Sequence, residues 1–393
     1  MGLLLPYYSQ SDPGSTPFDK MMPWLIGLSR HRPLRPAVEL QRATLVNVKL
    51  KWTKDRTLDS VVSRERHLRP VLHLIERISA DSRGQSPAQE LLPRRHHSEV
   101  STFMRRFPSV FYETFSSRTG GPWFALTNAA YRLRQRELQL LCQMESDLVD
   151  RLRRLLMMSV DRALPLGTID QLRWDMGLPS CYQRSLVPRY PTFFDLVQPP
   201  GDERVWMKLV SWDTRLAVSE LQRSRAAEVS EEGEEECLAF PVRFPRGFGL
   251  KKKCMEWLHE WQTLPYTSPY ADASGLDPRT DVSEKRNVGV FHELLHLTLG
   301  KKTERKNVSN LRKALSLPQK FTKVFERHPG IFYLSQKMAT QTVVLREAYG
   351  AGRELLYKHP LIDIRDEYLA LMKDSWTTRR SDERDDECTS VSS

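Results

Sequence analysis

The sequence predicts a mainly helical α+β protein in which three modules, each a helix followed by a β-hairpin, are joined by further helices. Two observations lead to this fold class. A six-residue pattern occurs three times along the chain, and each copy is followed by a second apolar stretch. Between the copies, long segments carry apolar residues at the spacing of an amphipathic helix.

The repeated pattern reads RFPSVF at 106–111, RYPTFF at 189–194 and RHPGIF at 327–332. Each copy has Arg, an aromatic residue or His, Pro, a small residue, a large apolar residue and Phe. Because proline disfavours helical structure at the residue before it, a helix is expected to end there. A turn-rich gap and a second apolar stretch complete a predicted hairpin. These second stretches lie at 122–126, 205–209 and 342–345.

A basic helix followed by a hairpin resembles a winged-helix module, which commonly binds nucleic acid. Leu-Pro pairs at 178–179 and 317–318 fit helix starts with proline in the first turn. The aromatic residues of the pattern are expected in the core, since a helix and a hairpin need large side chains between them. For the three Arg residues, RNA contact and plain solvation remain equally open. The predicted modules cover about 89–133, 172–217 and 308–350.

Other segments complete the predicted organisation. Apolar periodicity indicates further helices. The folded region should span 45–373, and the charged, Ser-rich residues 374–393 lack an apolar period and are expected to be a disordered tail. The additional helices are expected at 58–78, 131–164, 286–299 and 362–373.

Residues 1–44 are interpreted as a transit peptide and disordered leader. The stretch 20–38 is basic and partly apolar and contains no acidic residue, as organelle transit peptides do. A plain disordered tail is the alternative. A leader that contains Arg rather than many Ser and Thr residues favours the mitochondrion over the chloroplast. The true start could be Met1, Met21 or Met22.

The charge balance indicates a polyanionic partner. Sixty Lys and Arg residues against 49 Asp and Glu residues give a net charge of +11. Such an excess favours nucleic acid or an anionic membrane surface, although solvated basic side chains would give the same count. No apolar stretch approaches the roughly 18 residues that span a bilayer, so membrane insertion is not expected. Five scattered cysteines without a CxxC pair argue against a disulfide framework and a zinc ribbon.

Long stretches of the sequence resemble one known family. They read KLKWTKDRTLDSVVSRERHLRP at 49–70 and LPQKFTKVFERHPGIFYLSQKMATQTVVLREAY at 317–349. WFALTNAAYRL at 123–133, RWDMGLP at 173–179 and FHELLHLTL at 291–299 add to the match. Together they resemble the plant organelle RNA recognition domain family over nearly all of the folded region.

The resemblance implies an RNA-binding protein of mitochondria or chloroplasts that promotes the splicing of group II introns. It implies no enzymatic activity, no cofactor and no metal. The expected partners are intron-containing organellar RNA and other splicing factors. A structural component of an organelle complex is an alternative that does not involve RNA.

The candidate RNA-binding residues are basic side chains and one tryptophan. Lys and Arg neutralise phosphates and release counterions, so that affinity depends on salt. An exposed Trp52 could stack on an unpaired base, whereas a buried Trp52 would anchor the first helix. Lys320, Lys323 and Arg327 are spaced three and four apart and are expected on one helix face. The full set is Lys49, Lys51, Trp52, Lys54, Arg56, Arg64, Arg69, Arg106, Arg189, Lys313, Lys320, Lys323, Arg327 and Arg346.

One motif suggests an enzyme instead. Residues 292–296 read HELLH, which matches the HExxH motif of zinc proteases, where two His bind the metal and the Glu acts as base. The metzincin extension would require Gly and His where this chain has Leu299 and Lys302. Glu304 and Glu326 are available carboxylates without a recognisable second motif, and the segment also has an ordinary apolar core stripe. The alternative site would comprise His292, Glu293 and His296.

Phosphate-binding loops are missing from the sequence. It contains neither GxxxxGK[ST] nor GxGxxG, which are the loops that cradle nucleotide phosphates. An ATP-driven helicase role therefore has no support.

Overall fold

A computed structural model describes residues 50, 52–91, 97–115, 121–228, 238–245, 248–249, 251–350, 352 and 354–389. The predicted leader and the candidates Lys49 and Lys51 lie outside the described residues. Within the described ranges, no helix combines the length and the apolar character that crossing a membrane requires.

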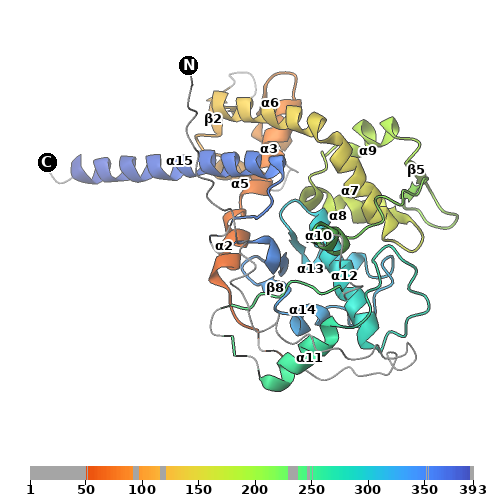
Figure 1. The fold of residues 1–393 in the computed structure, drawn as a ribbon. Coiled ribbons are helices and arrows are strands. Elements are labelled where there is room, and N and C mark those ends of the chain that lie inside the picture. Colours follow the sequence, from red (N-terminus) through yellow and green to blue (C-terminus); the bar gives the residue numbers. More distant parts are fainter. Residues whose placement is uncertain are drawn as a thin grey trace, which may run out of the picture. The chain divides into compact units, whose positions relative to one another are not determined.

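Three small antiparallel sheets organise the described chain, each with three strands (Figure 1). In every sheet the last strand of the sequence lies in the middle, between the first and the second. The first sheet contains β1 (Gln85–Pro87), β2 (Phe111–Phe115) and β3 (Pro122–Leu126). The second contains β4 (Ala163–Pro165), β5 (Phe194–Val197) and β6 (Trp206–Leu209). The third contains β7 (Lys302–Glu304), β8 (Phe332–Ser335) and β9 (Thr342–Leu345).

The same helices accompany each sheet. One longer helix precedes the first strand: α3 (Leu68–Ala80), α7 (Glu145–Met157) and α12 (Asp281–Leu297). Shorter helices lie between the first and second strands: α4 (Ala88–Leu91) and α5 (His97–Met104), α8 (Leu166–Met176), α9 (Tyr182–Ser185) and η1 (Val187–Arg189), and α13 (Arg305–Asn310) and α14 (Lys323–Arg327). Every unit therefore reads helix, strand, helices, strand, strand.

The remaining helices connect or cover these units. They are α2 (Arg56–Arg64), α6 (Asn128–Gln143), α10 (Glu220–Glu228), α11 (Lys252–Gln262), η2 (Arg346–Ala348) and α15 (Pro360–Thr389). The single helix expected at 58–78 is two helices, α2 and α3, and the one expected at 131–164 is α6 and α7, which meet at Met144. The last helix is longer than predicted, because its backbone continues into the charged tail.

The repeated pattern sets the register of all three hairpins. Its final Phe begins the second strand of each sheet, and that Phe pairs with a Leu of the third strand. The pairs are Phe111 with Leu126, Phe194 with Leu209 and Phe332 with Leu345. All three Phe side chains are buried, as predicted for the core. The hairpins were thus predicted correctly, but the short first strands were not.

Helix starts differ from the prediction. The Leu-Pro pairs do not open helices directly, because α9 begins at Tyr182 and α14 at Lys323, each after a turn. Lys320 consequently lies in the turn before α14, and its carbonyl accepts a hydrogen bond from the Lys323 N–H at 3.1 Å. The expectation that Lys320, Lys323 and Arg327 share a helix face is therefore wrong.

Three apolar clusters hold these elements together. The largest joins the second and third sheets with α7 and α12. Another joins the first sheet with α3 and α15. A small third cluster packs Leu58, Val61 and Val62 of α2 against Tyr333 and Val344 of the third sheet. This last contact brings the start of the folded region beside a hairpin near its end (Figure 1).

Candidate nucleic-acid interface

The segment before α2 is fixed to the third sheet by polar contacts. Asp55 caps α2, because its carboxylate accepts hydrogen bonds from the N–H groups of Thr57 and Leu58 at 3.0 and 3.2 Å. The hydroxyl of Tyr333 accepts the Asp55 N–H at 3.1 Å and donates to Asp59 at 2.9 Å. Tyr333 therefore positions residues 52–59 against β8.

Trp52 combines both roles that the sequence left open. Its indole N–H donates to the Leu334 carbonyl at 3.1 Å, and its ring stacks on Tyr333 with centroids 6.2 Å apart and planes at 16°. The residue nevertheless remains 43% exposed. It is anchored on one side and accessible on the other, which suits stacking on an unpaired base.

A pocket of about 330 Å³ opens beside Trp52. Three candidate cations line it, and they differ in availability. Lys323 is exposed. Arg327 forms an ion pair with the buried Glu284. Arg346 is buried, donates to Asp55 at 2.7 Å and lies over the Tyr333 ring at 5.0 Å, so it serves the fold rather than a ligand.

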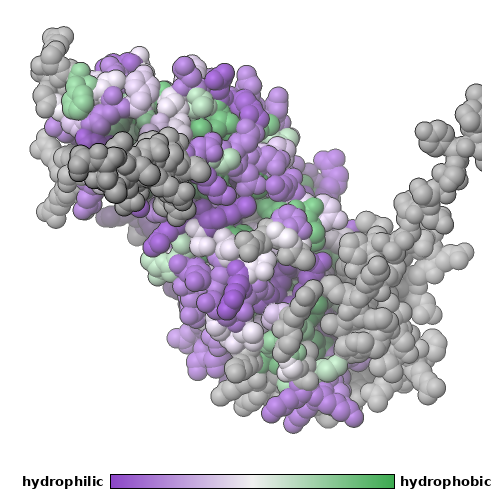
Figure 2. All heavy atoms as spheres, turned by 90° about the vertical axis from the view of Figure 1, so that its left-hand side faces the viewer, coloured by the Kyte–Doolittle hydropathy of each residue, from purple (hydrophilic) through white to green (hydrophobic). Residues whose placement is uncertain are grey.

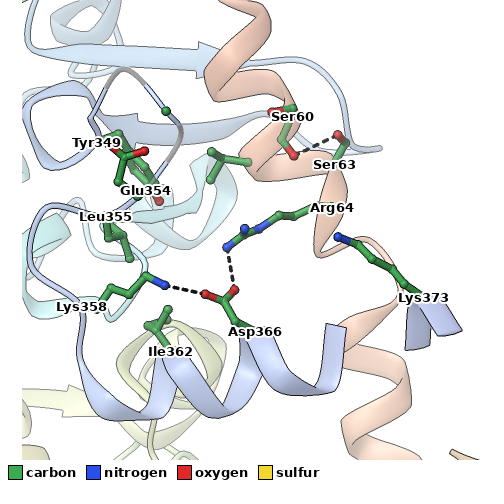
Figure 3. Close-up of a pocket in the computed structure, with 12 residues that line it drawn as sticks. Ser60, Ser63, Arg64, Tyr349, Glu354, Leu355, Lys358, Ile362, Asp366 and Lys373 are labelled. Atoms are coloured by element: carbon green, nitrogen blue, oxygen red, sulfur yellow. Dashed lines mark hydrogen bonds and ion pairs between the residues drawn. The ribbon is translucent and has the colours of Figure 1, made fainter. Parts of the chain in front are cut away.

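A second pocket of about 440 Å³ adjoins α2 (Figure 3). Arg64 and Lys358 both point at Asp366, with nitrogen-to-oxygen distances of 2.8 and 2.9 Å. Lys358 also lies 3.7 Å from Asp363, and the pocket is lined by Lys373 and Glu354 as well, so its cations are largely matched by carboxylates. Arg64 stays a candidate, although it carries a carboxylate partner.

The other candidates divide into paired and free cations. Arg69 lies 3.8 Å from Glu304, and Arg189 pairs with Glu145 at 2.6 Å. Among the described residues, the exposed candidates for which no acidic partner is found are Lys54, Arg56, Arg106, Lys313, Lys320 and Lys323. Trp52 and Lys323 are brought to one pocket, whereas Arg106 and Arg189 belong to the first and second units and line neither pocket.

The second hairpin carries exposed residues that the sequence prediction missed. Trp212 is 37% exposed, and the Arg162 guanidinium lies 4.9 Å from its ring centroid. Lys208 is also exposed on β6. The signal in the sequence was an aromatic residue three residues after the last strand of a hairpin, since β6 ends at Leu209. On the face shown in Figure 2, polar residues predominate and apolar areas are small.

The HExxH residues lie in α12 and do not form a protease site. His292 and His296 direct their Nε2 atoms at one oxygen of Glu347, at 2.7 and 2.9 Å. Glu293 points elsewhere, since its carboxylate accepts hydrogen bonds from the Tyr270 hydroxyl at 2.6 Å and the Glu220 N–H at 2.7 Å. A general base must reach the reacting water, and this carboxylate is already engaged.

Electrostatic interactions within the cluster of His292, His296 and Glu347 shift the pKa of each of these residues. Burial alone would raise the pKa of Glu347, but the two imidazoles hold that pKa well below its ordinary value. Burial lowers the pKa of His292, yet the Glu347 carboxylate raises it overall. Burial and the neighbouring His292 lower the pKa of His296. Sequence spacing missed Glu347 as the third member, because it follows β9 and not α12.

Comparison with known proteins identifies the family. The plant organelle RNA recognition domain model matches residues 53–377. WHAT'S THIS FACTOR 9, mitochondrial, from Arabidopsis thaliana is 37% identical over 344 residues, covering 85% of this chain and 88% of that protein. WHAT'S THIS FACTOR 1 homolog, chloroplastic, from Arabidopsis thaliana is 32% identical, covering 91% of this chain and 69% of that protein.

A maize relative adds to this picture. WHAT'S THIS FACTOR 1, chloroplastic, from Zea mays is 32% identical, covering 84% of this chain and 68% of that protein. No solved structure matches the chain. With a family model over nearly all of the described residues, the chain belongs to the plant organelle RNA recognition domain family.

Proposed function

We propose that this chain is a non-catalytic organellar RNA-binding protein that promotes the splicing of group II introns. The observation that carries the proposal is the pocket beside Trp52. It joins an accessible aromatic ring to the free cation Lys323 in a protein of an RNA recognition family. One group stacks on bases and the other neutralises phosphates.

The three units would act as winged-helix modules. What supports this is their order of elements, helix, strand, helices, strand, strand, with the third strand in the middle of the sheet. Three such modules would hold a structured RNA at several points. RNA of this kind is recognised through its shape, stacking and 2′-hydroxyl groups, since the deep groove of an RNA helix does not admit side chains.

The proposed role is to hold the intron in a splicing-competent fold, together with other splicing factors. The hydrogen bonds of Glu293 support a non-catalytic role, because they engage the carboxylate that would act as the base of an HExxH protease. The basic leader and a relative named as mitochondrial favour the mitochondrion. Chloroplastic relatives keep the chloroplast as the alternative.

Filter binding of the full chain to group II intron RNA at increasing salt tests the proposal. Trp52→Ala should weaken binding by about 1–3 kcal/mol, the contribution of one stacked base. Lys323→Glu should weaken binding and reduce the salt slope by about 1. Lys306→Glu is the control for net charge: it changes the charge equally within the third unit, but Lys306 lines neither pocket and already pairs with Glu304 at 2.9 Å.

Two outcomes would overturn the proposal at different levels. If the wild-type chain retains no RNA at low salt, the RNA-binding function is wrong and a structural role in an organelle complex is favoured. If RNA binds but Trp52→Ala and Lys323→Glu behave like Lys306→Glu, the function stands and the pocket is not the contact surface.

A further inference from the structure

The cluster of His292, His296 and Glu347 joins two elements that are far apart in sequence. Residues four apart on α12 lie one above the other on one helix face, which aligns the two imidazoles. Glu347 comes from η2, which follows the central strand of the third sheet. One ligand atom from each residue lies within 4.8 Å of the others. The exposed fractions of the side chains are 3%, 17% and 14%, respectively.

The hydrogen bonds of this cluster are incomplete. Both imidazole Nε2 atoms address the same carboxylate oxygen, Oε1 of Glu347. The other oxygen, Oε2, is buried without a hydrogen-bond partner. Buried carboxylate oxygens normally have partners, so an unpartnered one on the carboxylate that two imidazoles contact requires an explanation.

We propose that His292, His296 and Glu347 bind a divalent zinc-class metal ion at a structural site. Two imidazole nitrogens and one carboxylate oxygen form a donor set that zinc prefers, and the helical i, i+4 pair is its usual presentation. A water molecule would complete the tetrahedral coordination.

The geometry needs only a small adjustment to accept the ion. Ligand atoms at about 2.0–2.1 Å from zinc in a tetrahedral site lie roughly 3.3 Å from one another. The two distances between Nε2 and Oε1 are 2.7 and 2.9 Å. Opening them by about half an ångström would bring both to the tetrahedral separation, and the two Nε2 atoms, which lie within 4.8 Å of each other, would take up the same separation.

The site would be structural rather than catalytic. Glu293, the residue that acts as base in zinc proteases, accepts two hydrogen bonds and is buried. A metal at this position would instead tie α12 to the end of β9. The residue before Glu347 is Arg346, which pairs with Asp55 at the start of α2. The metal would therefore also support the segment that carries Trp52.

A network without metal is the competing explanation. In that case a proton shared between the imidazoles and Glu347 would hold the same three side chains together. Metal content distinguishes the two explanations, because only the proposed site takes up one ion per chain in a manner that requires all three side chains.

The full chain is first dialysed against a chelator and then loaded with zinc. We expect about one zinc per chain by mass spectrometry of the metal content, and a tetrahedral visible spectrum when cobalt replaces zinc. Glu347→Gln and His296→Gln should each weaken zinc binding by more than about a hundredfold, beyond the loss expected for outer partners alone. His359→Gln should bind zinc like the wild type, because its imidazole pairs with a single carboxylate, that of Asp147.

Circular dichroism identifies variants that fail to fold, and the cobalt spectrum of the wild-type chain decides the question without any variant. A wild-type chain that binds no more zinc than a His292→Gln, His296→Gln double variant overturns the proposal. So does a cobalt spectrum typical of six-coordinate solvated ion. A lower melting temperature in chelator, reversed by zinc, would support the structural role.

Discussion

The hydroxyl of Tyr333 should contribute strongly to stability, although it touches no ligand. The side chain is buried, and its oxygen lies between the Asp55 N–H at 3.1 Å and the Asp59 carboxylate at 2.9 Å. Ser335 also donates to Asp59 at 2.7 Å, so this buried carboxylate depends on two donors. Tyr333→Phe keeps the ring under Trp52 but removes one donor from Asp59 and the acceptor of the Asp55 N–H.

A hydrogen bond to a charged group contributes about 1.5–3 kcal/mol, and an unsatisfied buried group costs about 1–3 kcal/mol. Because the Ser335 bond remains, we expect Tyr333→Phe to lower the free energy of unfolding by about 2–4 kcal/mol. Urea unfolding followed by circular dichroism measures this loss. Tyr112→Phe is the control, since Tyr112 is half exposed on β2. If both variants lie within about 0.5 kcal/mol of the wild type, Tyr333 does not anchor this segment.

Two further predictions concern pH and packing. Burial raises the pKa of Asp175 from 3.8 to about 6, against an opposing hydrogen bond from Thr303. The folded state thus favours the neutral acid. The contribution of Asp175 to the free energy of unfolding is therefore full below pH 3.8 and is lost as the pH rises through about 6. Relative to Asp175→Asn, the wild type should lose roughly 3 kcal/mol of unfolding free energy between acidic and neutral pH, measured by urea unfolding. Parallel profiles of unfolding free energy against pH for the two proteins would contradict this. A Cβ at Gly330 would lie 2.4 Å from a methyl carbon of Val242, so Gly330→Ala should lower the free energy of unfolding by about 1–3 kcal/mol. Gly167 has open space around it, so Gly167→Ala should not destabilise the protein. Equal melting temperatures of the two variants would refute the packing argument.

The hairpins could be predicted because their signal is local. Proline, a small residue, a large apolar residue and Phe are consecutive in each repeat, and the same Phe-to-Leu pairing follows in all three sheets. The first strands could not be predicted. They have three residues each, QSP, ALP and KTE, which is too short for an alternating pattern, and they form only by pairing with a strand about 40 residues later.

The candidate site was harder to predict, because availability of a cation depends on distant acids. Arg346 and Asp55 are 291 residues apart in sequence, and Arg327 and Glu284 are 43 apart. On the helix expected at 131–164, Arg136 is likewise paired with a distant acid, Glu367, at 2.6 Å. Only tertiary structure reveals which basic residues remain free to bind a polyanion.

Arg346 and Glu347 show why counting basic residues in the sequence overestimates the cationic surface that a polyanion could reach. These neighbours lie in one 3-10 turn after β9, yet their partners lie in different elements: Asp55 before α2 for the arginine, and the two histidines of α12 for the glutamate. The turn thus connects two elements. Arg346 pairs with Asp55 in the segment that carries Trp52, and Glu347 contacts the two histidines of the buried helix α12. The guanidinium of Arg346 is buried and paired with the Asp55 carboxylate, so an RNA phosphate cannot reach it. Lys323 and Lys320 are exposed on the same unit, and under the proposed function they contact the RNA, so affinity should respond to them and folding stability to Arg346.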